Sequence, residues 1–291
     1  GMHGNLGPNV KTNECDVLIA VGMRFDDRVT AKLETYAKQA KVIHLDIDPS
    51  EISKNVKADV AILGNCKRTL ALLTELIQSH KHTEWIESFQ SYADKEFQEV
   101  IEKEVYPGEG PINMGEVVHA VSEATHNEAI LVTDVGQNQM FACRYFKFSK
   151  DRSIVTSGGM GTMGYALPAA IGAKLAKPKR QVVAVCGDGS FQMSMCELAT
   201  ANQNQVPLKL VVMRNKFLGM VKELQDNLYQ GRHVATPLNG DPDIVKLVQA
   251  YGIKAVFAQN NEDAKKLAKE MLESKEAYVL VCDVDPNTPS I

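Results

Sequence analysis

The residues of this sequence best suited to joint chemistry are an acid, Asp188, and an amide, Asn215. Asp188 lies in Gly187-Asp188-Gly189-Ser190, directly after the apolar run 181–186, and Asn215 follows the next such run, 208–213. The interval leaves room for a helix between two strands, and the carboxyl ends of adjacent parallel strands meet at one edge of a sheet. Mg²⁺ prefers oxygen ligands, of which proteins supply one or two, while phosphates and water supply others. The pair therefore predicts a magnesium site, although the Gly-Asp-Gly-Ser sequence alone could also form a tight turn with a helix cap.

Glycines on either side of Asp188 indicate that the ligand carries phosphate. Gly187 and Gly189 have no side chain, so backbone amides can approach phosphate oxygens closely. The helix expected after Ser190 directs its positive N-terminus to the same place. A second glycine-rich segment, 158–164, contains a literal GxGxxG, which is also the pattern of a dinucleotide fingerprint. The strand expected before it is short for a Rossmann first strand, so NAD binding remains the weaker alternative.

The elements that must position these residues follow from hydrophobic patterning. Apolar runs of strand length alternate with amphipathic runs of helix length, which predicts α/β architecture with doubly wound parallel sheets. The alternation falls into two blocks, so we predict one partial domain at 1–80, a linker at 81–110 and a second domain at 111–291. The linker is polar and charged, contains the only tryptophan, and ends in Pro107-Gly108-Glu109-Gly110-Pro111. The expected strands are 16–22 and 42–47 in the first block, and 129–133, 153–156, 181–186, 208–213 and 277–283 in a second sheet of five or six strands.

Composition restricts the class of partner. The formal net charge of −4 comes from interspersed acidic and basic residues, which leaves no basic surface for nucleic acid or for a membrane. The six cysteines lie far apart without a CxxC motif, as expected of free thiols in a reducing cytoplasm. No apolar run reaches the roughly 18 residues of a membrane span. We therefore expect a cytoplasmic protein that binds small molecules.

The segment from Gly187-Asp188-Gly189 to Asn215 resembles the fingerprint of thiamin-diphosphate enzymes, with Arg214 in place of the first of two usual asparagines. The match continues through Phe217-Leu218-Gly219-Met220-Val221. The resemblance implies that Phe217 offers its backbone carbonyl to the metal beside Asp188 and Asn215, and that a loop closes over the cofactor.

Two upstream segments are similar to those of acetolactate synthases. Residues 133–140 resemble the DVGQHQM stretch, with Asn138 replacing a histidine, and 158–173 resemble GGxGTMGxxLPAAIGA. An asparagine can donate to a diphosphate oxygen but cannot carry positive charge. By resemblance, Gly161 accepts from the exocyclic amine of the cofactor, and Met163 wedges beneath its bent shape, although a methionine at such a position could also be ordinary core. The implied thiamin-diphosphate contacts are Val135, Gly136, Gln137, Asn138, Gly161, Met163, Gly187, Gly189, Ser190, Gly219 and Met220.

The first block resembles the flavin-containing acetolactate synthases specifically. Residues 22–30 are similar to their GARFDDRVTG segment, which catabolic, flavin-free relatives lack. Arginines after a strand can pair with a dinucleotide diphosphate, and Asp46 after the next strand can hold a ribose hydroxyl. A solvated charge cluster is the alternative reading of these residues. The implied FAD contacts are Gly1, Met2, His3, Arg24, Arg28, Asp46, Ile47 and Asn65, the last at a position where aspartate is more frequent.

The resemblance implies the C-terminal part of the catalytic, large subunit of an acetolactate synthase. Such enzymes decarboxylate pyruvate and condense the product with pyruvate or 2-oxobutanoate in branched-chain amino acid biosynthesis. The catalytic glutamate belongs to an N-terminal domain that this chain lacks, so we expect no catalytic residue in the chain and no activity from it alone. Leu224 replaces the tryptophan of GMVRQWQ, which predicts a weaker preference for 2-oxobutanoate because the aromatic surface against its ethyl group is lost.

The expected cofactors are thiamin diphosphate, Mg²⁺ and FAD. The expected assembly is a homodimer or homotetramer, and a regulatory small subunit is compatible with it. Two alternatives remain open at the level of sequence. One is another thiamin-diphosphate carboligase or pyruvate oxidase, and the other is a non-catalytic nucleotide-binding module.

Overall fold

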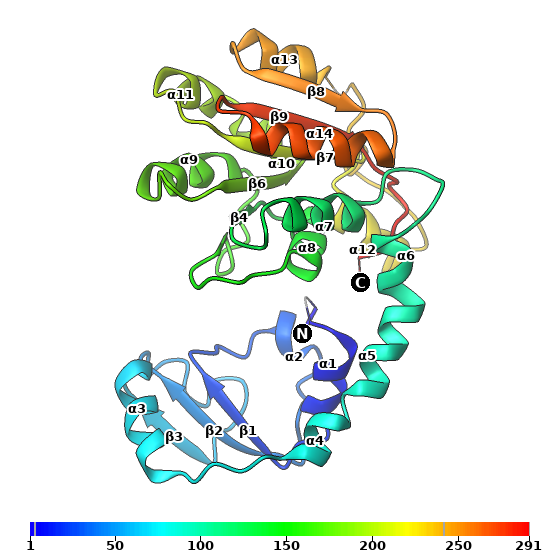
Figure 1. The fold of residues 1–291 in the computed structure, drawn as a ribbon. Helices are drawn as coiled ribbons and strands as arrows, with labels where there is room; N and C mark the ends of the chain where they lie inside the picture. Colours follow the sequence, from blue (N-terminus) through cyan, green and yellow to red (C-terminus); the bar gives the residue numbers. More distant parts are fainter. Residues whose placement is uncertain (3, 241, 291) are drawn as a thin grey trace. The chain divides into compact units, whose positions relative to one another are not determined.

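The computed structural model describes residues 1–2, 4–240 and 242–290, and it divides into two compact units, Gly1–Val100 and Ile101–Ile291 (Figure 1). The predicted flavin contact His3 therefore lies outside the described residues. Each unit contains its own parallel sheet covered by helices. The prediction of parallel α/β architecture is confirmed, and the domain boundaries proposed from the sequence stay a prediction.

Unit 1 contains a three-stranded parallel sheet in the order β1-β2-β3. Its small core packs Phe25 against Ala20 and Val42. The strands are β1 (Val17–Val21), β2 (Lys41–Asp46) and β3 (Val60–Leu63), and the helices are α1 (Leu6–Thr12), α2 (Asp27–Thr30), α3 (Cys66–Leu76), α4 (Thr83–Glu87) and α5 (Gln90–Glu96).

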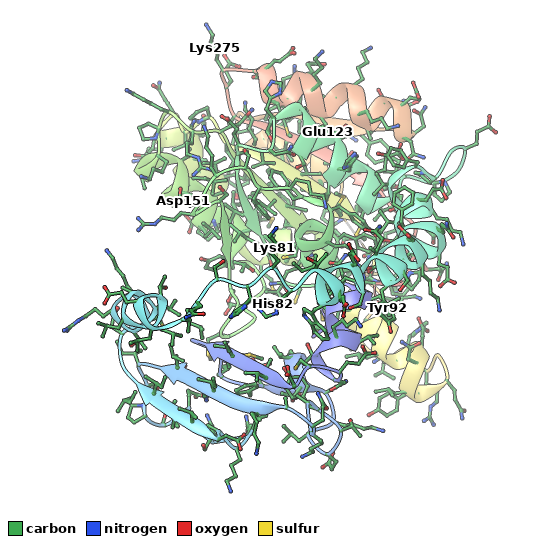
Figure 2. The ribbon with its side chains drawn as sticks, turned by 60° about the horizontal axis from the view of Figure 1, so that its bottom comes forward. Lys81, His82, Tyr92, Glu123, Asp151 and Lys275 are labelled. Carbon is green, nitrogen blue, oxygen red and sulfur yellow. The ribbon has the colours of Figure 1, made fainter. Side chains whose placement is uncertain are left out.

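The first half of the predicted linker packs against unit 1. Helices α4 and α5 surround the side chain of Lys11 on α1, whose ammonium lies 5.1 Å from the ring centroid of Trp85 and 5.5 Å from that of Tyr92 (Figure 2 labels Tyr92). Lys11 is buried, and its ammonium is stabilised by these rings, because the face of an aromatic ring is electronegative, and by an ion pair with Glu14 at 2.7 Å. The chain then continues through a π-helix (Phe97–Ile101) and α6 (Glu102–Val105) into the second unit.

Unit 2 contains a six-stranded parallel sheet in the order β5-β4-β6-β7-β9-β8. Its strands are β4 (Ile130–Thr133), β5 (Ile154–Thr156), β6 (Val182–Gly187), β7 (Lys209–Arg214), β8 (Lys254–Ala258) and β9 (Tyr278–Asp283). Its remaining helices are α7 (Met114–Ala124), α8 (Gln137–Tyr145), α9 (Ala166–Ala176), α10 (Asp188–Ser194), α11 (Glu197–Gln203), α12 (Gly219–Tyr229), α13 (Ile244–Ala250) and α14 (Asn261–Glu273).

Both faces of this sheet are buried, which explains why its central strands are continuous apolar runs. Side chains of α7, α8 and α14 form one core with alternate strand residues, and side chains of α9, α10, α11 and α13 form a second core on the other face. After β4 the chain places β5 on one side and then β6 on the other. The order of strands therefore reverses between β4 and β6, and open α/β sheets bind ligands at the carboxyl ends of strands beside such a reversal.

Candidate functional site

A pocket lies at this reversal and is lined by both glycine-rich segments found in the sequence. It contains every residue predicted to contact thiamin diphosphate or the metal. The lining residues are Met114, Val135, Gly136, Gln137, Asn138, Gly161, Met163, Gly187, Asp188, Gly189, Ser190, Met213, Asn215, Phe217, Leu218, Gly219, Met220 and Val221.

Asp188 and Asn215 emerge from neighbouring strands as the spacing predicts. Strands β6 and β7 are paired, with Gly187 opposite Met213. The Asp188 side chain is fully buried, and its Oδ2 accepts a hydrogen bond from the backbone nitrogen of Lys216 at 2.7 Å. Asn215 Oδ1 accepts from the backbone nitrogen of Phe217 at 3.0 Å. The acid is therefore bound directly to the turn that carries the amide.

The turn after Asn215 is held by a second segment of unit 2. The backbone nitrogen of Leu218 donates to Thr236 at 2.9 Å, and that of Leu238 donates to Lys216 at the same distance. This short antiparallel pairing fixes the backbone around Phe217, the residue whose carbonyl the resemblance assigns to the metal. Arg214, which replaces an asparagine of the fingerprint, pairs with Asp283 Oδ1 on β9 at 2.5 Å.

Close packing explains the glycines of the pocket. A Cβ atom at Gly189 would lie 2.8 Å from Leu218 Cδ2, and one at Gly219 would lie 2.1 Å from Gln137 Oε1. Gly161 has a φ of +61°, a left-handed conformation that glycine adopts without strain. These glycines therefore permit backbone approach and turning that other residues would prevent.

Asp134, which the sequence analysis did not single out, connects two segments that were predicted to contact the cofactor. It is 1% exposed, and its carboxylate accepts from the backbone nitrogens of Val135 at 2.8 Å, Gly164 at 2.9 Å and Ala166 at 2.8 Å. It thereby joins the end of β4 to the loop that contains Gly161 and Met163. Burial raises the pKa of the neighbouring Cys186 thiol, and the charges of Asp134 and Asp188 raise it further, so this thiol stays protonated.

The donor set fits a diphosphate held through a divalent cation. Asn138 is 5% exposed, and its Oδ1 makes no hydrogen bond with any residue that the structure describes. Buried polar atoms are nearly always paired, and this unpaired acceptor belongs to a residue that lines the pocket. A donor group or a cation would satisfy the oxygen, while the amide nitrogen of the same side chain can donate to a phosphate oxygen. No group of three or more His, Cys, Asp or Glu side chains able to hold a metal occurs among the residues described. A cation at Asp188 would therefore take its other ligands from amide and backbone oxygens and from the phosphates, as Mg²⁺ does.

The predicted flavin contacts follow the strands of unit 1. The backbone nitrogen of Met2 donates to the carbonyl of Arg28 at 2.9 Å, which places the chain start beside α2. Arg24 forms an ion pair with Asp26. Burial raises the pKa of Asp26, but the hydrogen bond from Arg24 and its positive charge outweigh this effect, so the pKa is lowered overall. Asp46 ends β2 and is buried.

The other flavin candidates differ in their surroundings. Gly1 hydrogen-bonds the side chain of Asn9 through its amino group. Ile47 is exposed, and Asn65 uses its side chain to cap α3 by accepting from the backbone nitrogen of Lys67 at 3.0 Å. Leu224, the predicted selectivity residue, is half-buried on α12 and is absent from the pocket lining given above.

The sequence analysis also missed Glu223 on α12. This buried carboxylate accepts from Gln137 Nε2 at 3.0 Å and from Ser290 near the end of the chain. Such long-range contacts leave no local sequence signal. Among the described residues, no helix has both the length and the apolar character required to cross a membrane.

Comparison with known proteins identifies related chains. The family model "Thiamine pyrophosphate enzyme, C-terminal TPP binding domain" matches residues 134–282, and the model "Thiamine pyrophosphate enzyme, central domain" matches 1–73. The chain is 41% identical over 292 aligned residues to a probable acetolactate synthase large subunit of Methanocaldococcus jannaschii, which covers 98% of this chain and 49% of that protein.

Bacterial relatives give the same result. The acetolactate synthase large subunit of Haemophilus influenzae is 41% identical, covering 97% of this chain and 49% of that protein. The acetolactate synthase isozyme 3 large subunit of Escherichia coli is 39% identical, covering 94% of this chain and 48% of that protein. The chain spans about half the length of the curated relatives it matches.

Proposed function

Because this chain belongs to the thiamine pyrophosphate enzyme family, we propose that it is the C-terminal part of the large subunit of an acetolactate synthase. The complete subunit would decarboxylate pyruvate and join the product to pyruvate or 2-oxobutanoate, a step of branched-chain amino acid biosynthesis. The observation that carries the proposal is the burial of Asp188 beside the turn of Asn215, in a pocket lined by both glycine-rich segments. Similarity to acetolactate synthase large subunits over nearly the whole chain supports it.

The residues of the pocket divide the work of holding the cofactor. Asp188, Asn215 and the carbonyl of Phe217 would hold Mg²⁺, and Gly136, Gln137, Asn138 and Ser190 lie where they would receive the diphosphate. Gly161 and Met163, joined to this end through Asp134, would orient the aminopyrimidine. When bound, the cofactor would supply a nucleophilic carbon and an electron-accepting ring for decarboxylation chemistry. The protein contributes binding, orientation and exclusion of water.

Unit 1 is proposed to hold FAD. The arginines after β1 and the buried Asp46 after β2 supply a diphosphate partner and a ribose partner at the carboxyl edge of a parallel sheet. We also propose a homodimer or homotetramer, and a regulatory small subunit, since the relatives are named as large subunits. A cytoplasmic location is proposed because all six cysteines are free thiols, which a reducing compartment maintains.

Calorimetric titration of Mg²⁺ and thiamin diphosphate into the complete subunit tests the cofactor site. Asp188→Ala should reduce the affinity by at least about tenfold, because it removes the only carboxylate proposed to bind the metal. Asp151→Ala provides the matched control, since Asp151 is exposed in the turn before β5 (Figure 2). Unchanged affinity in Asp188→Ala would remove this residue from the metal site. Product analysis with pyruvate tests the reaction, and acetaldehyde or acetyl phosphate in place of acetolactate would contradict the assignment.

A further inference from the structure

The buried carboxylate of Glu223 lies at the centre of a hydrogen-bond chain that ends at the proposed metal ligand. Its Oε1 accepts from the backbone nitrogen of Ser290 at 2.7 Å, and its Oε2 accepts from Ser290 Oγ at 2.5 Å and from Gln137 Nε2 at 3.0 Å. Gln137 Oε1 in turn accepts from Asn215 Nδ2 at 3.1 Å. Three buried side chains therefore connect the C-terminal segment with Asn215.

The polarity of each bond in this chain is determined by chemistry. An ionised carboxylate can only accept hydrogen bonds, so Gln137 must turn its NH₂ group toward Glu223. The oxygen of Gln137 then faces Asn215, which must present its own NH₂ group to it. As a result, Asn215 directs its oxygen to the opposite side.

Backbone groups at both ends require the same orientations. The carbonyl of Thr288 accepts from Gln137 Nε2 at 3.2 Å, so this end of the glutamine must be the nitrogen. The backbone nitrogen of Phe217 donates to Asn215 Oδ1 at 3.0 Å, so that end of the asparagine must be the oxygen. A carbonyl oxygen has a second lone pair, which remains for a cation.

Gly219 makes the contact between the two amides possible. A Cβ atom at this position would lie 2.1 Å from Gln137 Oε1 and 2.5 Å from Asn215 Nδ2. The amides therefore pack against the α-carbon of the first residue of α12. The same helix carries Glu223 one turn later, so α12 supplies both the acceptor and the space.

Glu223 supplies one acceptor of the Gln137 NH₂ group and holds the other in place. One acceptor is its own carboxylate, and the other is the carbonyl of Thr288, two residues before Ser290. Because Ser290 donates to Glu223 through its backbone nitrogen and its hydroxyl, loss of the carboxylate releases this segment and Thr288 with it. Glutamine at 223 would offer one oxygen and one NH₂ group, so one of the donors that now meet an oxygen would face another donor.

We propose that Glu223 is a positioning residue that acts through Gln137 to present the oxygen of Asn215, not its nitrogen, to a divalent cation. The inference rests on the proposed function for the identity of the cation site. The orientation of the two amides can be measured in the free protein without it.

NMR of the 291-residue chain with ¹⁵N-labelled asparagine and glutamine tests the orientation. The two side-chain NH₂ signals are assigned by their disappearance in Gln137→Glu and Asn215→Asp. In the unmodified chain both should exchange slowly with solvent, and in Glu223→Gln both should exchange about tenfold to a hundredfold faster, as expected for the loss of a hydrogen bond to a charged group. Glu273→Gln, an exposed glutamate on α14, is the matched control. Equal exchange in Glu223→Gln and in the control would overturn the proposal.

Electron paramagnetic resonance of Mn²⁺ with thiamin diphosphate measures the consequence for the cation. Glu223→Gln should weaken Mn²⁺ binding by about 10-fold to 100-fold, the usual effect of removing a group that orients a metal ligand. A chain that ends at Pro286 retains Glu223 but lacks Thr288 and Ser290, and it should show an intermediate loss. These affinities are measured in the complete subunit. Absence of Mn²⁺ binding in the unmodified complete subunit would overturn the proposed function, while normal affinity in Glu223→Gln would overturn the positioning role.

Discussion

Replacement of Asp134 should destabilise unit 2 even when no cofactor is present. The carboxylate is almost fully buried and accepts three backbone hydrogen bonds, two of which come from the loop at the start of α9. Hydrogen bonds to a charged group contribute about 1.5–3 kcal/mol each. Loss of the two bonds to Gly164 and Ala166 should therefore lower the free energy of unfolding by about 3–6 kcal/mol in Asp134→Ala.

Asp134→Asn separates the hydrogen bonds from the shape of the side chain. An asparagine has one acceptor oxygen, so its NH₂ group must face either Ala166 or the pair Val135 and Gly164, all of which are donors. The free energy of unfolding of Asp134→Asn should be about 1.5–3 kcal/mol lower than that of the wild-type protein, a smaller loss than in Asp134→Ala.

Urea unfolding followed by circular dichroism gives the stabilities, and native-state amide exchange at Gly164 and Ala166 locates the effect. Both amides should exchange faster in Asp134→Ala. Asp151→Ala, an exposed substitution in the same unit, should stay within about 0.5 kcal/mol of the wild-type protein. A loss below about 1 kcal/mol in Asp134→Ala, with unchanged exchange at both amides, would refute the view that Asp134 joins the two loops.

Three further predictions follow from the same structure. Gly219→Ala should weaken Mg²⁺ binding by about 10-fold to 100-fold in calorimetry, because its methyl group would displace Gln137 and Asn215; normal affinity would show that the pocket yields easily. Burial lowers the pKa of Lys209 to about 8, below the value of about 10.4 expected in the unfolded chain. Between these two pH values the unfolded state binds more protons than the folded state. The destabilisation caused by burying the Lys209 ammonium therefore decreases as pH rises through this range. In urea unfolding, the free energy of unfolding of Lys209→Met relative to that of the wild-type protein should therefore be higher at pH of about 7.5 than at about 10. An equal difference at both pH values would contradict the lowered pKa of Lys209. In the complete subunit, Leu224→Trp should raise the preference for 2-oxobutanoate over pyruvate by up to about 200-fold in a competition assay, and an unchanged product ratio would remove residue 224 from selectivity.

The arrangement of residues at the strand ends could be predicted from the sequence because it depends on local patterns. Two apolar runs with a helix between them define adjacent parallel strands, and the residues just after those strands must then meet at one edge. Asp188 and Asn215 meet in this way, and the pocket gathers the other residues assigned to thiamin diphosphate. The short β3 and the edge strand β8 were not anticipated, since four to five residues without a regular alternation of buried and exposed positions give little signal.

The supporting contacts could not be predicted, because their partners are distant in sequence. Asp134 is bound to Gly164 and Ala166, and Glu223 is bound to Ser290. The charged segment after residue 80 reads as linker by composition, yet part of it packs around Lys11. In each case a polar group is buried because a specific partner compensates its lost hydration, and composition does not encode that partner.

Two buried acids, Asp188 in the pocket lining and Asp134 beside it, affect the stability of the free protein. Asp134 and Asp188 both lie close enough to the Cys186 thiol to raise its pKa, so their negative charges lie in one poorly hydrated region. Backbone N–H groups that donate to both carboxylates offset part of that cost. A divalent cation would neutralise it, and a ligand that binds only the folded state stabilises by about 2.7 kcal/mol at 100 times its Kd. If the proposed Mg²⁺ site is right, the thermal stability of unit 2 should rise with Mg²⁺ and thiamin diphosphate in the wild-type chain but not in Asp188→Ala.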